Sequence, residues 1–247
     1  MAKPGRDGVK KDVLFLGGLV VVAVALIVFL VREPEAAAPE AGQIAGPGSS
    51  QVTAPGVAEG SATAGLAVER RMPDDPLAQG DPNAPVVMVM FADYRCPFCA
   101  KFSRDTEPEL VDRFVSDGTL RLEWRDLPIF GAQSMQAARA GRAAAAQGRF
   151  WEFNHAVFAE SPERGHADLT EEALVGFAQK AGVPDIERFS AQMRSTEFDA
   201  AINADLAQGT EIGVPSTPAF VINGVPTLGA QPTEVFVAAI TEAAGQA

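Results

Sequence analysis

The two cysteines of the chain lie three positions apart, in the sequence Cys96-Pro97-Phe98-Cys99. They follow the apolar run 86–91, which is long enough for a buried strand. A strand that leads into two cysteines of this spacing at the start of a helix is typical of thiol–disulfide exchange. The pair therefore predicts a redox-active dithiol.

The predicted helix start gives the two thiols different roles. If Cys96 is the N-cap, Pro97 falls at the first helical position, where a missing amide hydrogen costs nothing. The first-turn amides and the helix dipole then favour a thiolate at Cys96. Cys99 lies on the same helical face, within reach of a disulfide. We expect Cys96 to attack, Cys99 to resolve, and no cofactor beyond their disulfide.

Two other interpretations of the cysteines are open. Half of a zinc site would need two further ligands, and the other soft candidates are His155, in a helical pattern, and His166, in a polar loop. Two unrelated core cysteines would need neither this spacing nor an intervening proline. Redox chemistry accounts for both features, so we expect no metal.

The N-terminal part of the chain predicts a membrane anchor. Residues 13–31 carry no charge and are long enough to cross a bilayer as a helix. Basic residues cluster in 1–12 and only Arg32 follows the segment, which places 1–12 in the cytoplasm and the rest in the periplasm or another extracytoplasmic space. The alternative is a signal peptide cleaved near 36–38, although usual apolar regions of signal peptides span only about 7–15 residues.

Composition separates a tether from a folded part. Residues 32–75, rich in Ala, Pro and Gly, predict a flexible linker, and residues 76–247 a domain. The formal net charge of −12 at pH 7 argues against nucleic acid and anionic lipid as partners.

Apolar periodicity from residue 76 onwards predicts a mixed α/β domain. A strand buried on both faces covers 86–92, a helix kinked at Pro108 follows, and a strand over 120–125 has one charged, exposed face. Helical patterns alone fill the stretch 130–210, at 137–146, 150–158, 171–181 and 186–206. A hairpin over 219–228, with Pro226 in an edge strand, and a helix over 233–243 close the chain.

Residues 76–245 resemble the DsbA-like family of thiol–disulfide oxidoreductases, which have a thioredoxin fold with a helical insertion. Three segments carry the resemblance: 91–99 around the cysteines, 137–155 with the sequence Gln147-Gly148-Arg149-Phe150-Trp151-Glu152, and 213–224. The resemblance implies that Pro218 follows a cis peptide bond and that Thr217 and Pro218 hold an extended substrate. Two positions depart from the family: Phe98 stands where the best-known oxidases have His, and Ser216 where many relatives have Gly.

The resemblance implies an envelope dithiol oxidase that acts on exported cysteine-containing proteins and is reoxidised by a membrane quinone-linked thiol oxidase. A reductase of the same fold, for example in cytochrome maturation, is the alternative, because Phe98 lacks a charge that would stabilise the Cys96 thiolate. The third interpretation is a non-enzymatic metal-binding domain.

Two carboxylates are candidate proton carriers for Cys99. Asp93 lies at the end of the buried strand, three residues before Cys96, where burial can raise its pKa. It could equally cap a turn. Glu123, on the charged face of the second strand, is the weaker candidate.

Overall fold

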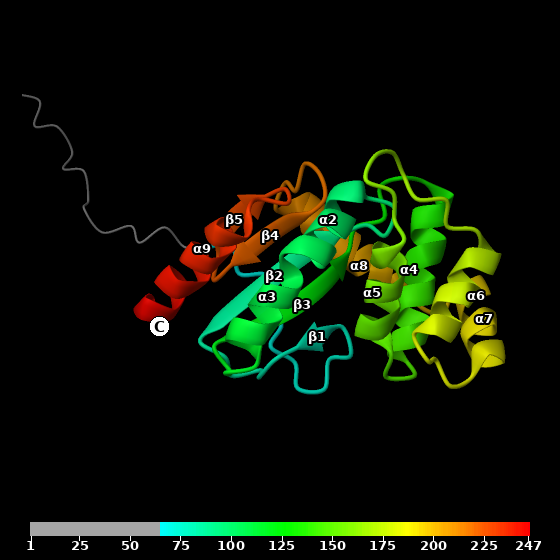
Figure 1. Ribbon diagram of the computed structural model, residues 1–247, viewed down its shortest axis with the longest axis horizontal. Coiled ribbons are helices and arrows are strands. Elements are labelled where there is room, and N and C mark those ends of the chain that lie inside the picture. Colours follow the sequence, from blue (N-terminus) through cyan, green and yellow to red (C-terminus); the bar gives the residue numbers. More distant parts are fainter. Residues whose placement is uncertain (1–64) are drawn as a thin grey trace, which may run out of the picture. The chain divides into compact units, whose positions relative to one another are not determined.

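The computed structural model describes residues 65–247. The predicted segments 1–12 and 13–31, and the linker up to residue 64, lie outside the described residues. Within 65–247, every helix is too short or too polar to cross a membrane. This part of the chain forms a five-stranded sheet in the order β1-β3-β2-β4-β5, with helices on both faces (Figure 1).

The strand that leads into the cysteines is the centre of the sheet. β2 (Val86–Ala92) pairs in parallel with β3 (Leu120–Asp126) and antiparallel with β4 (Ala219–Ile222). All seven residues of β2 are buried, which confirms the prediction of a strand covered on both faces. The predicted order of β-α-β, helices, β-β-α is confirmed as well.

The two edges of the sheet were not equally predictable. β5 (Val225–Leu228) pairs with β4 through a turn at Asn223 and Gly224, whose φ angles of 42° and 86° suit a tight hairpin. Pro226 lies in this edge strand, as predicted. The other edge is β1 (Ala78–Gln79), two residues long and too short to show a pattern.

One face of the sheet is covered by helices that pack around a cluster of aromatic rings. After β2 come α2 (Pro97–Asp105), α3 (Glu107–Leu110) and the π-helical turn η1 (Val111–Val115), with the predicted break near Pro108. The C-terminal helix α9 (Thr233–Gln246) lies beside them. The rings of Phe102, Phe220 and Phe236 pack together, with centroids 4.6–5.2 Å apart.

The helical stretch between β3 and β4 has two parts. α4 (Ala132–Ala145), α5 (Phe150–Ala159), α6 (Glu171–Lys180) and α7 (Ile186–Arg194) pack on one another (Figure 1). α8 (Asp199–Glu211) instead packs on β3. A single helix over 186–206 is therefore wrong. The Ser195 hydroxyl donates to the carbonyl of Gln192 and accepts from the amide of Glu197, which ends α7.

The charged face of β3 is also a correction. All seven residues of the strand are buried, including Arg121, Glu123 and Arg125. Glu123 accepts from Arg121 Nε at 2.9 Å and from Arg125 Nη2 at 2.7 Å. The alternation of apolar and charged residues predicted an exposed face, because charged side chains are seldom fully buried. These are buried because they are paired with one another and with their neighbours.

The end of the predicted linker helps to bury these charges. Val68 is 2% exposed, and the backbone amides of Arg70 and Arg71 donate to the two carboxylate oxygens of Glu123 at 2.9 and 2.8 Å. The boundary at residue 76 is therefore too late, because residues 66–72 belong to the folded domain. We call the ion-paired residues on and around β3 the buried ion network: Arg70, Arg121, Glu123, Arg125, Asp126, Arg142 and Asp205.

Candidate active site

The two cysteines occupy the positions that the sequence predicts. Cys96 is the N-cap of α2, with extended backbone angles and Pro97 immediately after it. Both cysteines are free thiols, and both are buried, at 2% and 0% exposure. The strand β2 is held on both sides by β3 and β4, so the start of α2 sits at a fixed edge of the sheet.

The two thiols have different surroundings, and these shift their pKa values in opposite directions. A hydrogen bond from Cys99 lowers the pKa of Cys96 to about 6, despite burial, with help from Thr217 and from the amides of Cys99 and Phe98. Burial raises the pKa of Cys99 well above its ordinary value, and the neighbouring Cys96 raises it further. At neutral pH the arrangement favours a thiolate at Cys96 and a protonated thiol at Cys99.

The loop before β4 faces the dithiol. The Thr217–Pro218 peptide bond is cis, and the Cys96 thiol donates to the carbonyl oxygen of Thr217 at 3.2 Å. Pairing of Ala219 with Phe91 brings the end of this loop to the same sheet edge as the start of α2. The cis bond that the family resemblance implied is therefore present. Thr217 and Pro218 therefore lie beside the Cys96 sulfur.

Asp93 is part of the active-site turn, and its carboxylate already accepts hydrogen bonds from backbone amides. It accepts from the amides of Arg95 and Ile129, each at 2.8 Å, and from the amide of Phe130 at 3.2 Å. Burial raises the pKa of Asp93, and these hydrogen bonds partly offset the rise. The geometry is that of the turn cap weighed above, joining the active-site turn to the loop after β3.

Glu123 does not fit a proton carrier. Burial alone would raise its pKa, but the hydrogen bonds from the Arg70 amide and from Arg121 and Arg125 lower it to about 2. The carboxylate is therefore ionised at any pH at which the dithiol works, and it lies in the buried ion network rather than beside Cys99.

Arg95 was missed in the sequence. Its guanidinium donates to the carbonyl oxygens of Phe130 at 2.5 Å and Ala167 at 2.8 Å. The His166 ring stacks on Phe130, with centroids 4.2 Å apart, and its Nδ1 lies 3.3 Å from the Arg95 carbonyl oxygen. These contacts hold the loop between α5 and α6 beside the dithiol. No local pattern could reveal them, because the partners are 35 and 72 positions away.

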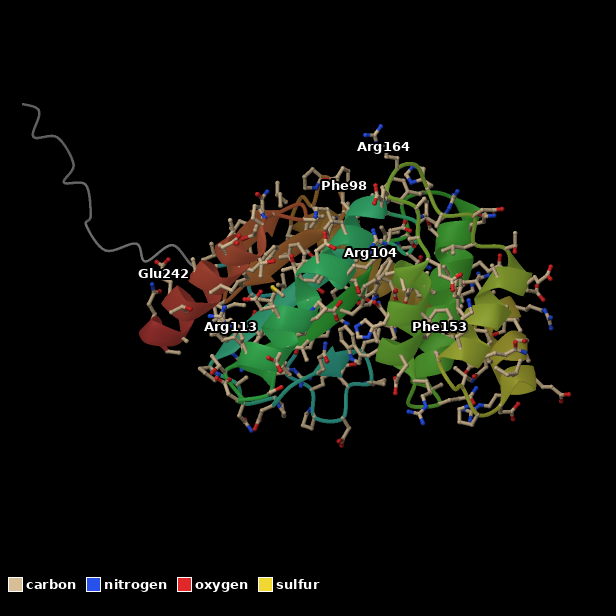
Figure 2. All side chains as sticks on the ribbon, viewed as in Figure 1. Phe98, Arg104, Arg113, Phe153, Arg164 and Glu242 are labelled. Carbon is tan, nitrogen blue, oxygen red and sulfur yellow. The ribbon has the colours of Figure 1, made fainter. Side chains whose placement is uncertain are left out.

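Three large apolar side chains are exposed in or near the segments that form the dithiol site. Phe98 is 60% exposed, Ile129 43% and Leu228 48%. Figure 2 labels Phe98 at the start of α2. Exposed apolar side chains are candidates for contact with another molecule, and Phe98 lies between the two cysteines in the chain.

The two histidines do not join the cysteines. His155 contacts Glu107, and His166 contacts Phe130 and Arg95. Across residues 65–247, no three His, Cys, Asp or Glu side chains converge as a metal site would require.

A central sheet, a dithiol at a helix N-terminus and a facing cis-proline define a thioredoxin-like protein. The thioredoxin family model matches residues 73–242. The structure of a thioredoxin-like oxidoreductase from Silicibacter pomeroyi is 31% identical, with a TM-score of 0.59 over 69% of this chain and 92% of that one. BdbD from Bacillus subtilis is 21% identical, with a TM-score of 0.64 over 68% of this chain and 92% of that one.

Relatives found by sequence are of two kinds. The Na(+)/H(+) antiporter NhaA 3 of Salinispora tropica is 31% identical over 69% of this chain, which spans only 25% of the antiporter. The probable disulfide bond formation protein D of Bacillus anthracis is 27% identical over 59% of this chain and 68% of its own length. The chain belongs to the thioredoxin family.

Proposed function

We propose that this chain is a membrane-anchored, extracytoplasmic dithiol oxidase that introduces disulfides into exported proteins. Its class, protein disulfide oxidoreductase, follows from its family; the anchoring, location and direction of electron flow are the proposal. The observation that carries it is the contrast between the thiols: a pKa of about 6 at Cys96 against a strongly raised pKa at Cys99. A stabilised thiolate makes the dithiol form favourable, and hence the disulfide oxidising.

The proposed reaction begins with a disulfide between Cys96 and Cys99. A client thiolate attacks the Cys96 sulfur, the bond to Cys99 breaks, and Cys99 leaves and takes up a proton because its pKa is high. A second client thiolate then attacks the client sulfur of the mixed disulfide and releases Cys96 as a thiolate. The client loses two electrons and gains a disulfide, and the dithiol receives both electrons.

Thr217 and Pro218 are the proposed substrate-holding residues. In this role the backbone of the loop pairs with an extended client segment, and Phe98, Ile129 and Leu228 contact its side chains. The proposed redox partner is a membrane quinone-linked thiol oxidase, which would accept the two electrons. Residues 13–31 would hold the enzyme in the same membrane.

A reductase is the second candidate, and Phe98 is the observation that favours it. A charged side chain at this position would stabilise the thiolate further, and Phe98 supplies none. A pKa of about 6 lies between the values of about 3.5 for the strong oxidant DsbA and about 7 for the reductant thioredoxin.

The equilibrium with glutathione distinguishes the two directions. The domain is incubated in glutathione buffers of graded potential, and the fraction of dithiol is measured by alkylation and mass. A potential close to the DsbA value of about −120 mV supports the oxidase, whereas one close to the thioredoxin value of about −270 mV overturns it in favour of the reductase. Labelling of whole cells with a membrane-impermeant maleimide tests the location, with residues 1–31 deleted as the control.

Trapping identifies the attacking thiol. We expect Cys99→Ala to accumulate mixed disulfides with client proteins through Cys96, since the second thiol is needed for release. Non-reducing gels of cells that carry Cys99→Ala, Cys96→Ala or both changes provide the measurement. Adducts that persist in Cys96→Ala would reverse the two roles.

A further inference from the structure

A cavity that takes no part in the dithiol site lies where α3 and η1 meet α5. Its volume is about 550 Å³, and neither cysteine lines it. Arg104, at the end of α2, lines the cavity and is labelled in Figure 2. The residues that line the cavity include Gln79, Ser103, Glu107, Val111, Asp112 and His155.

Glu107, one of the residues that line this cavity, has a carboxylate oxygen without a hydrogen-bond partner. Glu107 is 1% exposed, and its Oε1 lies 3.4 Å from Gln79 Nε2 and 3.2 Å from His155 Nε2. Its Oε2 is also buried and has no hydrogen-bond partner. A buried acceptor without a donor costs about 1–3 kcal/mol, and more when the group is charged, so a carboxylate held in this way marks a place for a donor.

The chemistry of the walls indicates which donor fits. Arg104, the cation closest along the chain, is engaged by the carbonyl oxygens of Phe158 and Ser161. Asp112 adds a second negative charge, while Pro108, Val111 and Ala159 supply apolar surface. A metal ion lacks ligands, because no three acidic, His or Cys side chains converge among the described residues. The site suits a cation with an apolar stem.

We propose that this cavity binds an alkylammonium group, with Glu107 Oε2 as its counter-ion and the Val111 side of the cavity around its carbon chain. A free amine and the lysine side chain of another protein carry this same group. The site is separate from the dithiol, so its occupation does not depend on the proposed direction of electron flow.

His155 makes the binding dependent on pH. The hydrogen bond with Glu107 raises the pKa of His155, burial opposes the rise, and the charges of Glu107 and Glu152 add to it. The charged groups around the imidazole are Arg104 from α2, Asp112 from η1 and Glu152 from α5. As pH falls through this pKa, the imidazolium neutralises Glu107, so the affinity for an ammonium group should fall.

The test titrates the reduced, purified protein with n-butylammonium in the presence of EDTA and follows binding by NMR and calorimetry. We expect saturable binding that perturbs Ser103 and His155, and no binding of n-butanol. Glu107→Gln should weaken it by about tenfold or more, because a charged hydrogen bond is lost. Glu109→Gln is the matched control: Glu109 is on the same helix but does not line the cavity, and it should leave binding unchanged.

Further arms separate the sources of the ammonium group and guard against misfolding. Binding of N-acetyl-lysine methylamide, but not of the norleucine analogue, identifies a protein side chain; binding of the free amine alone identifies a small molecule. If Glu107→Gln does not fold, Ala159→Trp narrows the cavity and must abolish binding. Equal binding of amine and alcohol, unchanged binding in either variant, or no binding at all overturns the proposal. In His155→Gln, the pH dependence of the affinity should disappear.

Discussion

Two clusters of buried polar groups in this domain behave in opposite ways. In the buried ion network, Glu123 receives donors from Arg121, Arg125 and two backbone amides, and its pKa falls to about 2. In the active-site turn, hydrogen bonds from the Cys99 thiol and from the first amides of α2 lower the pKa of Cys96 to about 6 while burial opposes them, so its proton can leave and return near neutral pH. A saturated cluster fixes its charge and holds structure, whereas a partly saturated one can do chemistry.

The largest effect should come from breaking the saturated cluster. Glu123→Ala would leave Arg121 and Arg125 buried without a counter-charge, and we expect a loss of about 3–5 kcal/mol in the free energy of unfolding. Urea unfolding measures it. The alkylation of Cys96 in the folded fraction should keep its wild-type pH profile. A change of that profile together with unchanged stability would contradict the separation of the two clusters.

The same cluster should also make stability depend on pH. The pKa of Glu123 is lowered to about 2 in the folded state, from its ordinary value near 4.5. Its contribution is therefore fully present above the unfolded value and is lost as pH falls from about 4.5 towards 2. Glu123→Ala should flatten the acid limb of a plot of unfolding free energy against pH.

The second effect concerns the partly saturated cluster. We expect iodoacetamide to alkylate Cys96 of the reduced domain about 100-fold faster than Cys99 at pH 7, because only Cys96 combines a low pKa with a helix N-terminus. The rate at Cys96 should rise with pH through a midpoint near 6. Mass spectrometry of the labelled peptides gives both rates, and equal rates would remove the assignment of roles.

Sequence patterns were sufficient where local rules govern. The buried strand 86–92, the helix start at Pro97 and the turn at Asn223-Gly224 each follow from a short stretch of chain, and each is confirmed. The cis peptide bond before Pro218 was predicted from the family resemblance, because no local sequence pattern could predict it. The predicted anchor at 13–31 lies outside the described residues.

The failures that concern buried polar residues share one physical cause. The charges of β3 look exposed in the alternation, but Glu123 accepts from two backbone amides of the predicted linker. Asp126 pairs with Arg142 of α4, and Arg125 donates to Gln208 of α8. Arg95 and Glu107 likewise find partners 35 to 72 positions away. A sequence pattern predicts that a polar residue is exposed, because it does not show a partner that lies far away in the chain. Buried polar clusters therefore cannot be predicted from local sequence patterns.

Asp93 shares features with both clusters, because it accepts several hydrogen bonds, as Glu123 does, and has a shifted pKa beside the dithiol. Its replacement should have a smaller effect than that of Glu123. Asp93→Asn keeps the size of the side chain but offers one acceptor oxygen to three amides, so we expect a loss of about 1–2 kcal/mol in stability. If Asp93 only caps the turn, the rate of client oxidation should keep its pH profile. If it carries the proton of Cys99, the profile should lose the limb that reports its raised pKa. Stopped-flow oxidation of a dithiol peptide across pH separates the two.

The smallest effect should come from adding charge to the active-site turn itself. Phe98→His would place an ionisable group beside the developing Cys96 thiolate, and its protonated form should lower the Cys96 pKa and stabilise the dithiol. Since Phe98 is 60% exposed, the fold should tolerate the change. We expect a more oxidising couple, by about 30 mV for each 1.4 kcal/mol of added stabilisation. The shift should grow as pH falls through about 6.5, where an unperturbed His gains its charge. Glutathione equilibria of both forms at two pH values measure it, with Phe98→Leu as the uncharged control. A potential that moves equally in both variants would mean that Phe98 acts through packing or client contact, and that charge at this position does not set the potential.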